Sequence, residues 1–300
     1  MKDLKGKVAV VTGGASGIGL SMAQAFAAEG MKLVIADIEE EALAQAVDGL
    51  KGRGCEAIGV RADVSKYEDV AVLADRTLAA FGKVHLVVNN AGVSITGPTW
   101  QMSLDDWRWV YGVNVWGVIH GIKAFTPIQL AQGEGGHVVI TASEAAFLGI
   151  GQHSPYCSSK AAALSIGLSL YSELAAANSG IGVSVVCPGF VDTQIHRSWR
   201  NRPAEDRPWN EAEGRDPQRI AMADAFQSRG VPPEEIARVT LDAVKENRFY
   251  VFNTAHWREM IAGLRDATVG GENPPVYTWG PDQRPEAARS GPASGEARRP

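Results

Sequence analysis

Short apolar runs rich in β-branched residues alternate along the chain with longer stretches that have a helical pattern of apolar positions. The runs predict buried strands over residues 7–12, 32–37, 55–60, 85–90, 136–143, 181–188 and 246–252. The stretches between them predict helices, among them residues 17–30, 39–51, 104–132 and 155–178. Strands that alternate with helices are typical of βαβ units, and strands that are apolar throughout are typical of a sheet covered on both faces. The pattern therefore predicts an α/β fold with one doubly wound parallel sheet and helices on both faces.

Two regions interrupt this alternation. Residues 190–230 follow the last long strand and are polar, contain several prolines and carry tryptophan. Residues 270–300 are rich in Gly, Pro, Glu and Arg, a composition typical of a poorly ordered tail. We therefore predict one domain over residues 1–269, with a long insertion at 190–230, followed by a C-terminal tail over 270–300.

The composition suits one large globular domain, because 45% of the 300 residues are hydrophobic and 21% are charged. The net charge of −5 gives no sign of the clustered basic face that a nucleic-acid-binding protein needs. Cys55, Cys157 and Cys187 lack metal-ligand spacing and indicate free thiols in a reducing compartment. The sequence has no apolar run of about 18 residues and no signal-peptide pattern. We expect a cytoplasmic protein with no metal, no membrane contact and no nucleic-acid partner.

A glycine-rich turn, TGGASGIG, joins the first predicted strand to the first predicted helix. Gly13, Gly17 and Gly19 would let the backbone approach a pyrophosphate, to which the helix N-terminus offers free N–H groups and a positive dipole end. A tight turn without a ligand would also contain glycines, but a strand before it and a helix after it favour a Rossmann-type dinucleotide site.

Asp37 ends the second predicted strand, where a carboxylate accepts hydrogen bonds from ribose hydroxyls and repels a 2′-phosphate. Ile38 follows it, and the glycine turn contains no Arg or Lys to bind such a phosphate. Asp37 therefore favours NAD over NADP. The alternative is that Asp37 only caps the following helix.

Tyr156 and Lys160 lie four residues apart at the start of a predicted helix, and therefore on one face of it. Such a pair is common on exposed helix faces, where it has no catalytic role. A phenol with a reference pKa of about 10 is a weak acid, however, and a nearby ammonium stabilises the phenolate and lowers the pKa. The pair is thus also suited to moving a proton to or from an alcohol oxygen.

Together these motifs resemble those of the short-chain dehydrogenase/reductase family. The resemblance covers about residues 5–195 and rests, in family order, on TGGASGIG, ADV (62–64), NNAG (89–92), VNVWG, TAS, YCSSK and PG (188–189). It implies a catalytic tetrad formed by Asn114, Ser143, Tyr156 and Lys160. It also implies an NAD site formed by Gly13, Ser16, Gly17, Ile18, Gly19, Asp37, Asp63, Val64, Asn90, Ala91, Gly92, Tyr156, Lys160, Pro188, Gly189, Val191 and Thr193.

Each group of the implied tetrad has its own task. Tyr156 would transfer the proton, and Lys160 would lower the pKa of Tyr156 and contact the ribose of the cofactor. Ser143 would donate a hydrogen bond to the carbonyl oxygen, where negative charge develops. Asn114 would hold a helix kink and a water molecule that links Lys160 to solvent. Because the family builds its substrate lid after the last long strand, residues 190–230 are called the lid below.

The substrate pocket is expected to be mostly apolar. Besides the lid, its walls would be Val93, Ile95, Ala145, Leu148 and Phe190. The lid residues Trp199 and Trp209 are candidates for substrate contact. We interpret four further side chains as packing residues, namely Cys157, Cys187, Trp107 and Trp109.

Other polar side chains leave the interpretation open. His153 would lie either at the pocket mouth or in a surface loop. The arginines of the lid suggest an anionic substrate, but Glu205 and Asp206 offset their charge locally. We therefore draw no conclusion from the arginines Arg197, Arg200, Arg202 and Arg207.

The C-terminal part departs from the family. Many members end in a strand with a Tyr-x-Thr-Gly signature, whereas here a helical pattern follows the strand at 246–252. That ending puts a tetramer in doubt, but the helices at 104–132 and 155–178, which form the dimer face in relatives, are kept. We expect a homodimer, with a tetramer as the alternative. The ending and the long lid are similar to those of bacterial Cα-dehydrogenases of lignin-derived aryl ethers.

These features predict an NAD-dependent oxidoreductase that interconverts a bulky hydrophobic or aromatic secondary alcohol and its ketone. One alternative is an epimerase or dehydratase that keeps its NAD tightly bound. Another is a non-catalytic nucleotide-sensing protein on the same fold. Such sensing proteins tend to lose Tyr or Lys from the active site, and this chain has both.

Overall fold

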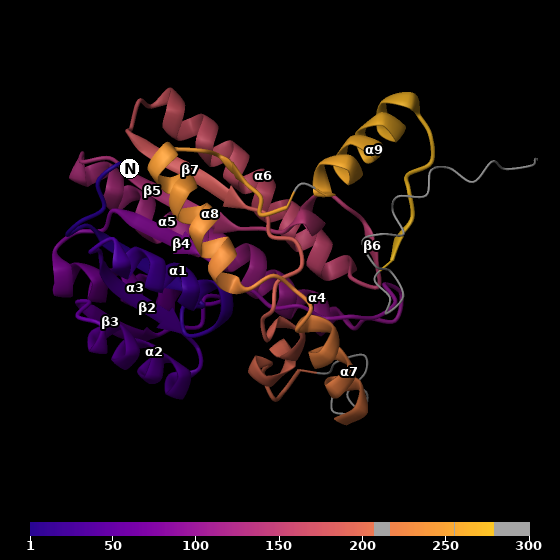
Figure 1. Ribbon diagram of the computed structural model, residues 1–300, viewed down its shortest axis with the longest axis horizontal. Coiled ribbons are helices and arrows are strands. Elements are labelled where there is room, and N and C mark those ends of the chain that lie inside the picture. Colours follow the sequence, from indigo (N-terminus) through magenta and orange to yellow (C-terminus); the bar gives the residue numbers. More distant parts are fainter. Residues whose placement is uncertain (207–216, 255, 279–300) are drawn as a thin grey trace, which may run out of the picture.

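The computed structural model describes residues 1–206, 217–254 and 256–278. Within these ranges the main sheet is parallel and has seven strands in the order β3-β2-β1-β4-β5-β7-β8 (Figure 1). The strands are β1 (Val8–Thr12), β2 (Lys32–Asp37), β3 (Ala57–Arg61), β4 (Leu86–Asn89), β5 (Gly136–Thr141), β7 (Ile181–Val186) and β8 (Tyr250–Val251). The strand order reverses direction at β1, so the predicted doubly wound parallel sheet is confirmed.

The centre of the sheet is apolar on both faces. Val10 of β1 lies opposite Val34 of β2 on one side and opposite Val87 of β4 on the other. All three side chains are buried. Strands with helices above and below have no solvent-facing side, which is why their sequences are apolar throughout rather than alternating.

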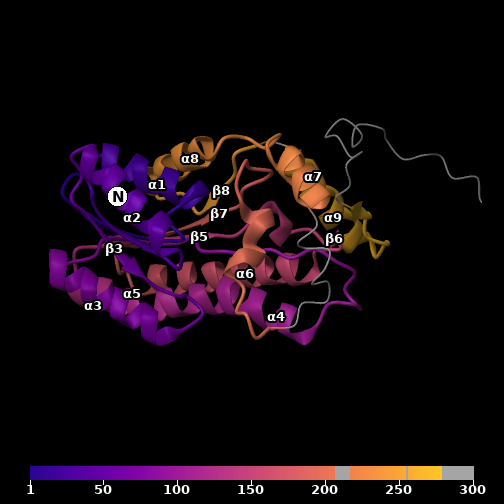
Figure 2. The same ribbon diagram turned by 90° about the horizontal axis from the view of Figure 1, so that it is seen from below.

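Helices cover both faces of this sheet (Figure 2). One layer contains α1 (Gly17–Ala28), α2 (Glu40–Gly52) and α8 (Pro233–Glu246). The other contains α3 (Tyr67–Phe81), α4 (Leu104–Tyr111), α5 (Gly117–Gln132) and α6 (Ser154–Ala176). Phe26 of α1 and Phe125 of α5 are the largest fully buried side chains, and each belongs to the core on its own side of the sheet.

The helix predicted over residues 104–132 is interrupted. A π-helical turn, η1 (Gly112–Trp116), separates α4 from α5 and has Asn114 at its middle. The Asn114 side-chain oxygen accepts from Val93 N at 2.9 Å, and its Nδ2 donates to Val93 O at 3.0 Å. These two bonds fasten the wide turn to the loop after β4, a position typical of π-turns at functional sites.

The described part of the lid contains the 3-10 helix η3 (Ile195–Asn201) and the helix α7 (Pro217–Gln227). Asp224 of α7 joins the two, because it accepts a hydrogen bond from Arg197 Nε at 2.8 Å and lies 2.6 Å from His196 Nε2. Residues 207–216, which include Arg207 and Trp209, lie outside the described residues.

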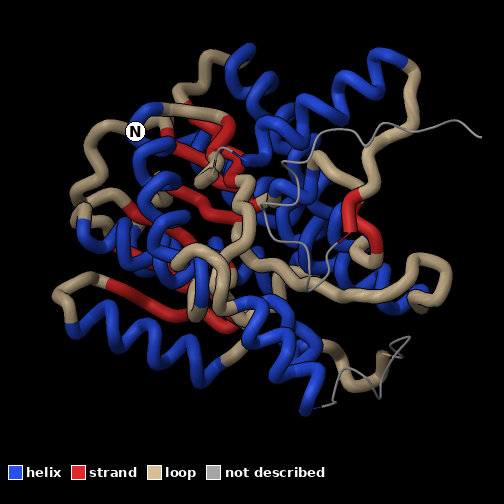
Figure 3. Tube along the Cα trace, turned by 45° about the vertical axis from the view of Figure 1, so that its right-hand side comes forward, coloured by secondary structure: helices blue, strands red, loops and turns tan. Residues whose placement is uncertain are grey.

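After β8 the chain forms α9 (His256–Gly270), so the predicted last strand and the helix after it are present, although the strand is shorter than 246–252. A short strand, β9 (Tyr277–Thr278), then pairs with β6 (Ile150–Gly151) in a separate two-stranded sheet (Figures 1 and 3). Tyr277 Oη donates to Met260 O at 3.2 Å. In the tail predicted to start at residue 270, residues 271–276 are exposed and Tyr277–Thr278 form this short strand, while residues 279–300 lie outside the described residues. No helix in the described ranges has the length and apolarity needed to cross a bilayer.

Candidate active site

A cavity of about 1210 Å³ lies along the carboxyl ends of the strands and is lined on one side by the lid. In an open α/β sheet, ligands bind at this edge, where the strand order reverses. Every cofactor residue predicted from the sequence lines the cavity, and so do Ser143, Tyr156 and Lys160. Asn114 is the predicted site residue that does not line it.

Packing against the loop after β4 and the lid determines the shape of the glycine turn. Gly13 has a φ of +61°, and a Cβ at this position would lie 2.8 Å from the Cα of Ala91. Gly17 has a φ of +50°, and a Cβ there would lie 3.3 Å from Thr193 Cγ2 of the lid. Both positions require glycine, because larger residues would clash or be strained. The turn and the lid thus meet at the cofactor end of the cavity.

The start of α1 suits an anion. Ser16 is its N-cap residue, but the Ser16 side chain makes no capping hydrogen bond, and no acidic side chain lies in the first turn. The N–H groups of this turn are therefore left to a ligand, and the helix dipole favours a negative charge there. Asn90 supports the turn from β4, because its Nδ2 donates to Thr12 O at 3.0 Å and to Gly13 O at 3.2 Å.

Asp37 lines the cavity at the end of β2. Its carboxylate accepts from Ala15 N at 3.0 Å and from Glu39 N at 3.1 Å, so it ties the glycine turn to the loop after β2. Burial raises the pKa of Asp37, and these hydrogen bonds oppose the rise. The N-cap residue of α2 is Glu39, so the alternative role of Asp37 as a helix cap is wrong.

Asp63 and Val64 line the same end of the cavity. Asp63 Oδ1 accepts from Ser65 N at 3.0 Å and from Ser65 Oγ at 2.7 Å. Val64 is buried, and its carbonyl oxygen lies 2.9 Å from His120 Nδ1. Both residues thus shape the edge of the cavity beside β3.

Ser143, Tyr156 and Lys160 meet where β5 ends and α6 begins. Lys160 Nζ donates to Thr141 O at 2.7 Å and lies 5.7 Å from the centroid of the Tyr156 ring. A hydrogen bond with Ser143 lowers the pKa of Tyr156, but burial outweighs it and raises that pKa to about 12. Burial also lowers the pKa of Lys160 to about 8. The predicted lowering of the Tyr156 pKa by Lys160 is therefore not produced by the chain's own groups, because removing the phenolate from water is the larger effect.

Asn114 does not line the cavity but is hydrogen-bonded to the helix that carries Lys160. It is buried, and its Nδ2 donates to Ser159 Oγ at 2.9 Å, next to Lys160 in α6. The predicted helix kink is present as the π-turn, and it joins the loop after β4 to α6. The water molecule predicted between Asn114 and Lys160 stays a prediction.

Four of the five predicted pocket walls line the cavity, namely Val93, Ile95, Ala145 and Phe190. The prediction for Leu148 is wrong. Leu148 follows the 3-10 turn η2 (Glu144–Ala146) and is buried in a cluster with Ala145, Ile150 and Cys157, behind the residues that line the cavity. Cys157 and Cys187 are buried among apolar side chains, as predicted.

In the described part of the chain, two tryptophans, Trp109 and Trp199, line the cavity, and Trp107 does not. Trp199 lines the cavity, as expected. Trp109 is buried and packs with Val93 and Val110, as predicted, and it also lines the cavity. The guanidinium of Arg202 lies 5.3 Å from its ring centroid. Trp107 packs on Tyr111, with ring centroids 6.1 Å apart. His153 also lines the cavity, which favours the pocket-mouth alternative.

Sequence reasoning missed three polar features of this site. Glu144, directly after Ser143, lines the cavity, and burial raises its pKa to about 7. Arg200 of the lid pairs with Glu39 after β2. Arg202 of the lid pairs with Asp106 of α4, where both side chains are buried. No sequence motif marks any of these residues.

The comparisons with known proteins identify the family. Residues 7–204 match the sequence profile described as short chain dehydrogenase. The chain belongs to the short-chain dehydrogenase/reductase family. A C alpha-dehydrogenase from Sphingobium sp. (strain NBRC 103272 / SYK-6) is 36% identical over 266 residues, covering 86% of this chain and 84% of that protein. The predicted resemblance to the family is confirmed.

Two further relatives extend the comparison. A 1-deoxy-11-beta-hydroxypentalenate dehydrogenase from Streptomyces exfoliatus is 34% identical over 257 residues, covering 85% of this chain and 86% of that protein. The crystal structure of a short chain dehydrogenase/reductase from Burkholderia phymatum in complex with NAD superimposes with a TM-score of 0.85 at 42% identity. That superposition covers 92% of this chain and 98% of the other.

Proposed function

We propose that this short-chain dehydrogenase/reductase is an NAD-dependent oxidoreductase that interconverts a bulky hydrophobic or aromatic secondary alcohol and its ketone. One observation carries the proposal: the cavity has Ser143, Tyr156 and Lys160 in one part of its wall and the glycine turn and Asp37 in another. Hydride transfer to or from a carbonyl carbon needs both a dinucleotide site and a proton-transfer group, held in one cavity.

The residues present fit a nicotinamide dinucleotide. The uncapped start of α1 and the close-packed glycine turn would hold the pyrophosphate. Asp37, already oriented by Ala15 N and Glu39 N, has lone pairs left to accept from a ribose hydroxyl. When bound, the nicotinamide would accept or supply the hydride. The structural relative from Burkholderia phymatum was solved with NAD, which supports the same cofactor here.

The chain's own groups would handle the proton. Tyr156 Oη would give a proton to the substrate oxygen during reduction and take it back during oxidation. Ser143 would donate a hydrogen bond to the same oxygen. Lys160, with a pKa of about 8, stays protonated at neutral pH and offers a positive charge beside the Tyr156 ring.

The substrate class follows from the wall of the cavity. Val93, Ile95, Trp109, Phe190 and Trp199 present apolar or aromatic surface to it. Such surface binds an apolar skeleton through its burial. The names of the two sequence relatives, a C alpha-dehydrogenase and a dehydrogenase of a hydroxylated pentalenate, support an alcohol as substrate.

A screen of secondary alcohols with NAD tests the proposal. Aryl alcohols, steroids and terpenols should be included, and formation of NADH followed by absorbance. We expect NADH with at least one bulky alcohol, and at least about 100-fold slower NADH formation with the same alcohol and Tyr156→Phe protein. Absence of NADH from the whole panel would contradict the proposal. A purified protein that retains its dinucleotide, shown by its absorbance spectrum, and oxidises no alcohol would favour the epimerase or dehydratase instead.

The same protein is proposed to form a homodimer. Apolar side chains are exposed at η1 and along α5 and α6, namely Trp116, Leu130, Leu168 and Tyr171. Light scattering measures the mass in solution, and Tyr171→Glu should shift it toward the monomer if these helices form the interface.

A further inference from the structure

Glu144 places a carboxyl group beside the catalytic residues. This carboxyl group has no role in the fold and none in proton transfer to the carbinol oxygen. It begins η2, and its backbone N donates to Pro188 O at 3.0 Å. Its side chain lines the cavity and lies over Gly189, where an added Cβ would be 3.0 Å from Glu144 Oε2. The carboxyl group therefore lies between Ser143 and the segment after β7.

Among the described residues, none donates a hydrogen bond to the carboxyl group of Glu144 or forms an ion pair with it. Burial alone raises its pKa, to about 7. Its charge raises the pKa of Tyr156 and of Cys187. Lys160 donates to Thr141 O instead. Burying a carboxyl group without a partner costs free energy, and the charge of Glu144 also opposes the ionisation of Tyr156. A group kept at this cost inside an active-site cavity indicates a role in binding a ligand.

We propose that Glu144 binds a second hydroxyl group of the substrate, close to the carbinol that Tyr156 and Ser143 serve. The preferred substrates would then be diols on an otherwise apolar skeleton, and the products hydroxyketones. This inference rests on the proposed function, because it names the substrate class of the same site.

The spacing of the two groups follows from the chain. Ser143 and Glu144 are consecutive and both line the cavity, and the charge of Glu144 adds to the effect of burial in raising the pKa of Tyr156, so the carboxyl group lies near the proton-transfer group. Ser143 binds the oxygen of the reacting carbon, so a group held by Glu144 lies within a few bonds of that carbon. A 1,2-diol or a 1,3-diol has this spacing.

A hydroxyl group fits Glu144 better than other polar groups. Near neutral pH the side chain is present both as the acid and as the carboxylate, because its pKa is about 7. A hydroxyl group both donates and accepts, so it pairs with either form. An ether oxygen accepts only and would pair with the acid alone, whereas an ammonium donates only and would pair with the carboxylate alone.

Matched substrates and variants test the inference. The matched substrates are 1-phenylpropan-1-ol and the corresponding 1,2- or 1,3-diol. The quantity measured is kcat/KM for the diol divided by kcat/KM for the monoalcohol. We expect a ratio of about ten or more for the wild type, because a site that hydrogen-bonds a substrate OH rejects the analogue that lacks it. Glu144→Leu should bring the ratio close to one. Glu144→Gln should keep most of it, because an amide also donates and accepts.

A control variant and a binding measurement complete the experiment. Glu173→Gln changes an exposed carboxyl group of α6 and should keep the wild-type ratio. Calorimetric titration with the hydroxyketone and the plain ketone measures the same preference without turnover. Circular dichroism and the melting temperature establish that each variant is folded.

The outcomes separate the two proposals. Turnover of both alcohols with a ratio that Glu144→Leu leaves unchanged would overturn the role of Glu144 but leave the oxidoreductase in place. Turnover of neither alcohol would count against the proposed function, and the calorimetric ratio would then decide on Glu144 alone. A stronger preference for the corresponding amino alcohol than for the diol would overturn the hydroxyl assignment.

Discussion

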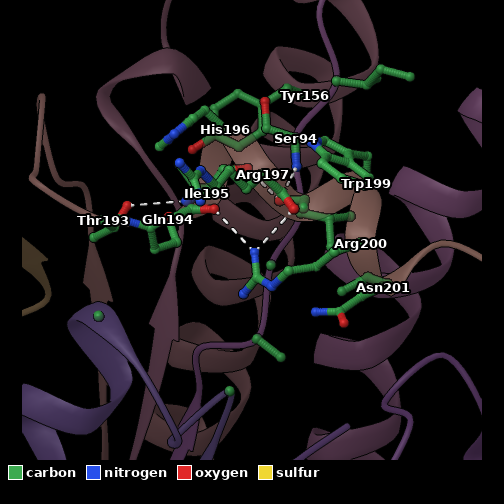
Figure 4. A pocket seen from close by; sticks show the side chains of 18 of the residues that line it. Ser94, Tyr156, Thr193, Gln194, Ile195, His196, Arg197, Trp199, Arg200 and Asn201 are labelled. Atoms are coloured by element: carbon green, nitrogen blue, oxygen red, sulfur yellow. Dashed lines mark hydrogen bonds between the residues drawn. The ribbon is translucent and has the colours of Figure 1, made fainter. Parts of the chain in front are cut away.

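Arg200 of the lid and Glu39 after β2 form an ion pair at the cofactor end of the cavity, with Arg200 Nη2 2.7 Å from Glu39 Oε1. Asn201 Nδ2 donates to the same oxygen at 2.8 Å. Arg200 is held within the lid as well, because its Nη1 donates to Arg197 O at 3.0 Å and to Gln194 O at 3.3 Å (Figure 4). The lid is thus fastened to the segment that follows Asp37.

Removal of this ion pair should speed the release of a bound dinucleotide. Both side chains are about one-third exposed, at 33% and 31%, so solvent screens the pair. Pairs of this kind contribute roughly 0.2–1 kcal/mol. Arg200→Ala should therefore raise the dissociation rate of NADH by up to about fivefold, measured by stopped-flow fluorescence.

Two further variants test whether the pair itself is responsible. Glu39→Gln should have a similar effect, and the double variant should add little to it, because the second change removes a partner that is already lost. Arg238→Ala is the matched control, since Arg238 pairs with Asp242 on the surface of α8. An NADH dissociation rate that stays at the wild-type value in Arg200→Ala would show that the lid is held by other contacts.

NAD should be preferred to NADP by at least about tenfold in kcat/KM. A 2′-phosphate beside Asp37 would place like charges together, at a cost on the order of 4 kcal/mol per pair at 4 Å before relaxation and screening. One-third of that corresponds to about tenfold in affinity. The cations that line this end of the cavity are each paired with a carboxylate already: Arg61 with Glu40, Lys66 with Asp63 and Arg200 with Glu39.

The double variant Asp37→Ala/Ile38→Arg should narrow or reverse the preference, because a guanidinium binds phosphate through two parallel hydrogen bonds. Asp37 also accepts from Ala15 N, so Asp37→Asn is the control that keeps an acceptor at this position. Kinetics with both dinucleotides give the ratio. Equal use of NAD and NADP by the wild type would contradict the assignment of Asp37.

Tyr156→Phe should lower turnover at least about 100-fold, because a positioned proton donor contributes 10²–10⁴-fold. The variant loses the hydroxyl and keeps the ring against Lys160, so its dissociation constant for NADH should stay within a few-fold of the wild type. Steady-state rates and fluorescence titration measure the two quantities. A variant with one-tenth of the wild-type rate would exclude Tyr156 as the main proton donor.

Glu144→Gln should change how stability depends on pH. Burial raises the pKa of Glu144 to about 7, above its reference of about 4.3, so the folded protein binds the proton more tightly than the unfolded chain. This contribution is fully present below pH 4.3 and is lost as the pH rises through 7. Relative to the wild type, the variant should therefore gain stability from pH 5 to pH 8, on the order of 2 kcal/mol after allowance for partial exposure.

Urea unfolding of both proteins at the two pH values gives this difference. Burial lowers the pKa of His137 to about 3, so His137 contributes the opposite slope, but it is present in both proteins and cancels. Parallel stability curves for wild type and Glu144→Gln would mean that Glu144 keeps its ordinary pKa.

Arg202→Met should destabilise the fold by about 3 kcal/mol, because it removes the cation that pairs with the buried carboxylate of Asp106. Arg202 Nη1 lies 2.5 Å from Asp106 Oδ1, and the exposed fractions of the two side chains are 7% and 0%. The double variant Asp106→Leu/Arg202→Met should recover part of the loss. Arg108→Met, at an exposed pair with Asp105, should leave the urea midpoint unchanged.

Local motifs made most of the site predictable. The glycine turn and the Tyr156–Lys160 pair are each contained in a few consecutive residues, and the strand or helix that carries them has a clear pattern. The carboxyl ends of parallel strands lie at one edge, so motifs at those ends had to converge there. The cofactor residues therefore line one cavity, as expected.

Contacts between distant segments were not predictable. Arg200 and Glu39 are 161 residues apart, and Arg202 and Asp106 are 96 apart, so no pattern along the chain links them. Leu148 was misplaced because one 3-10 turn decides which way it points. Burial is the largest cause of the raised pKa of Tyr156 in the cofactor-free chain, and it is a property of the folded cavity that the lysine four residues away does not reveal.

The π-turn at Gly112–Trp116 acts as a one-residue insertion within an otherwise continuous helix. Such a turn closes its hydrogen bonds one residue later than an α-turn, so the backbone widens there and a single residue is accommodated locally. That extra residue can be gained or lost without changing the helical phase of α4 or α5. Loss of one residue here would regularise the helix, keep both packed faces, and withdraw the Asn114 amide from Val93 and Ser159. The link between the loop after β4 and the helix of Lys160 therefore depends on a length difference of one residue.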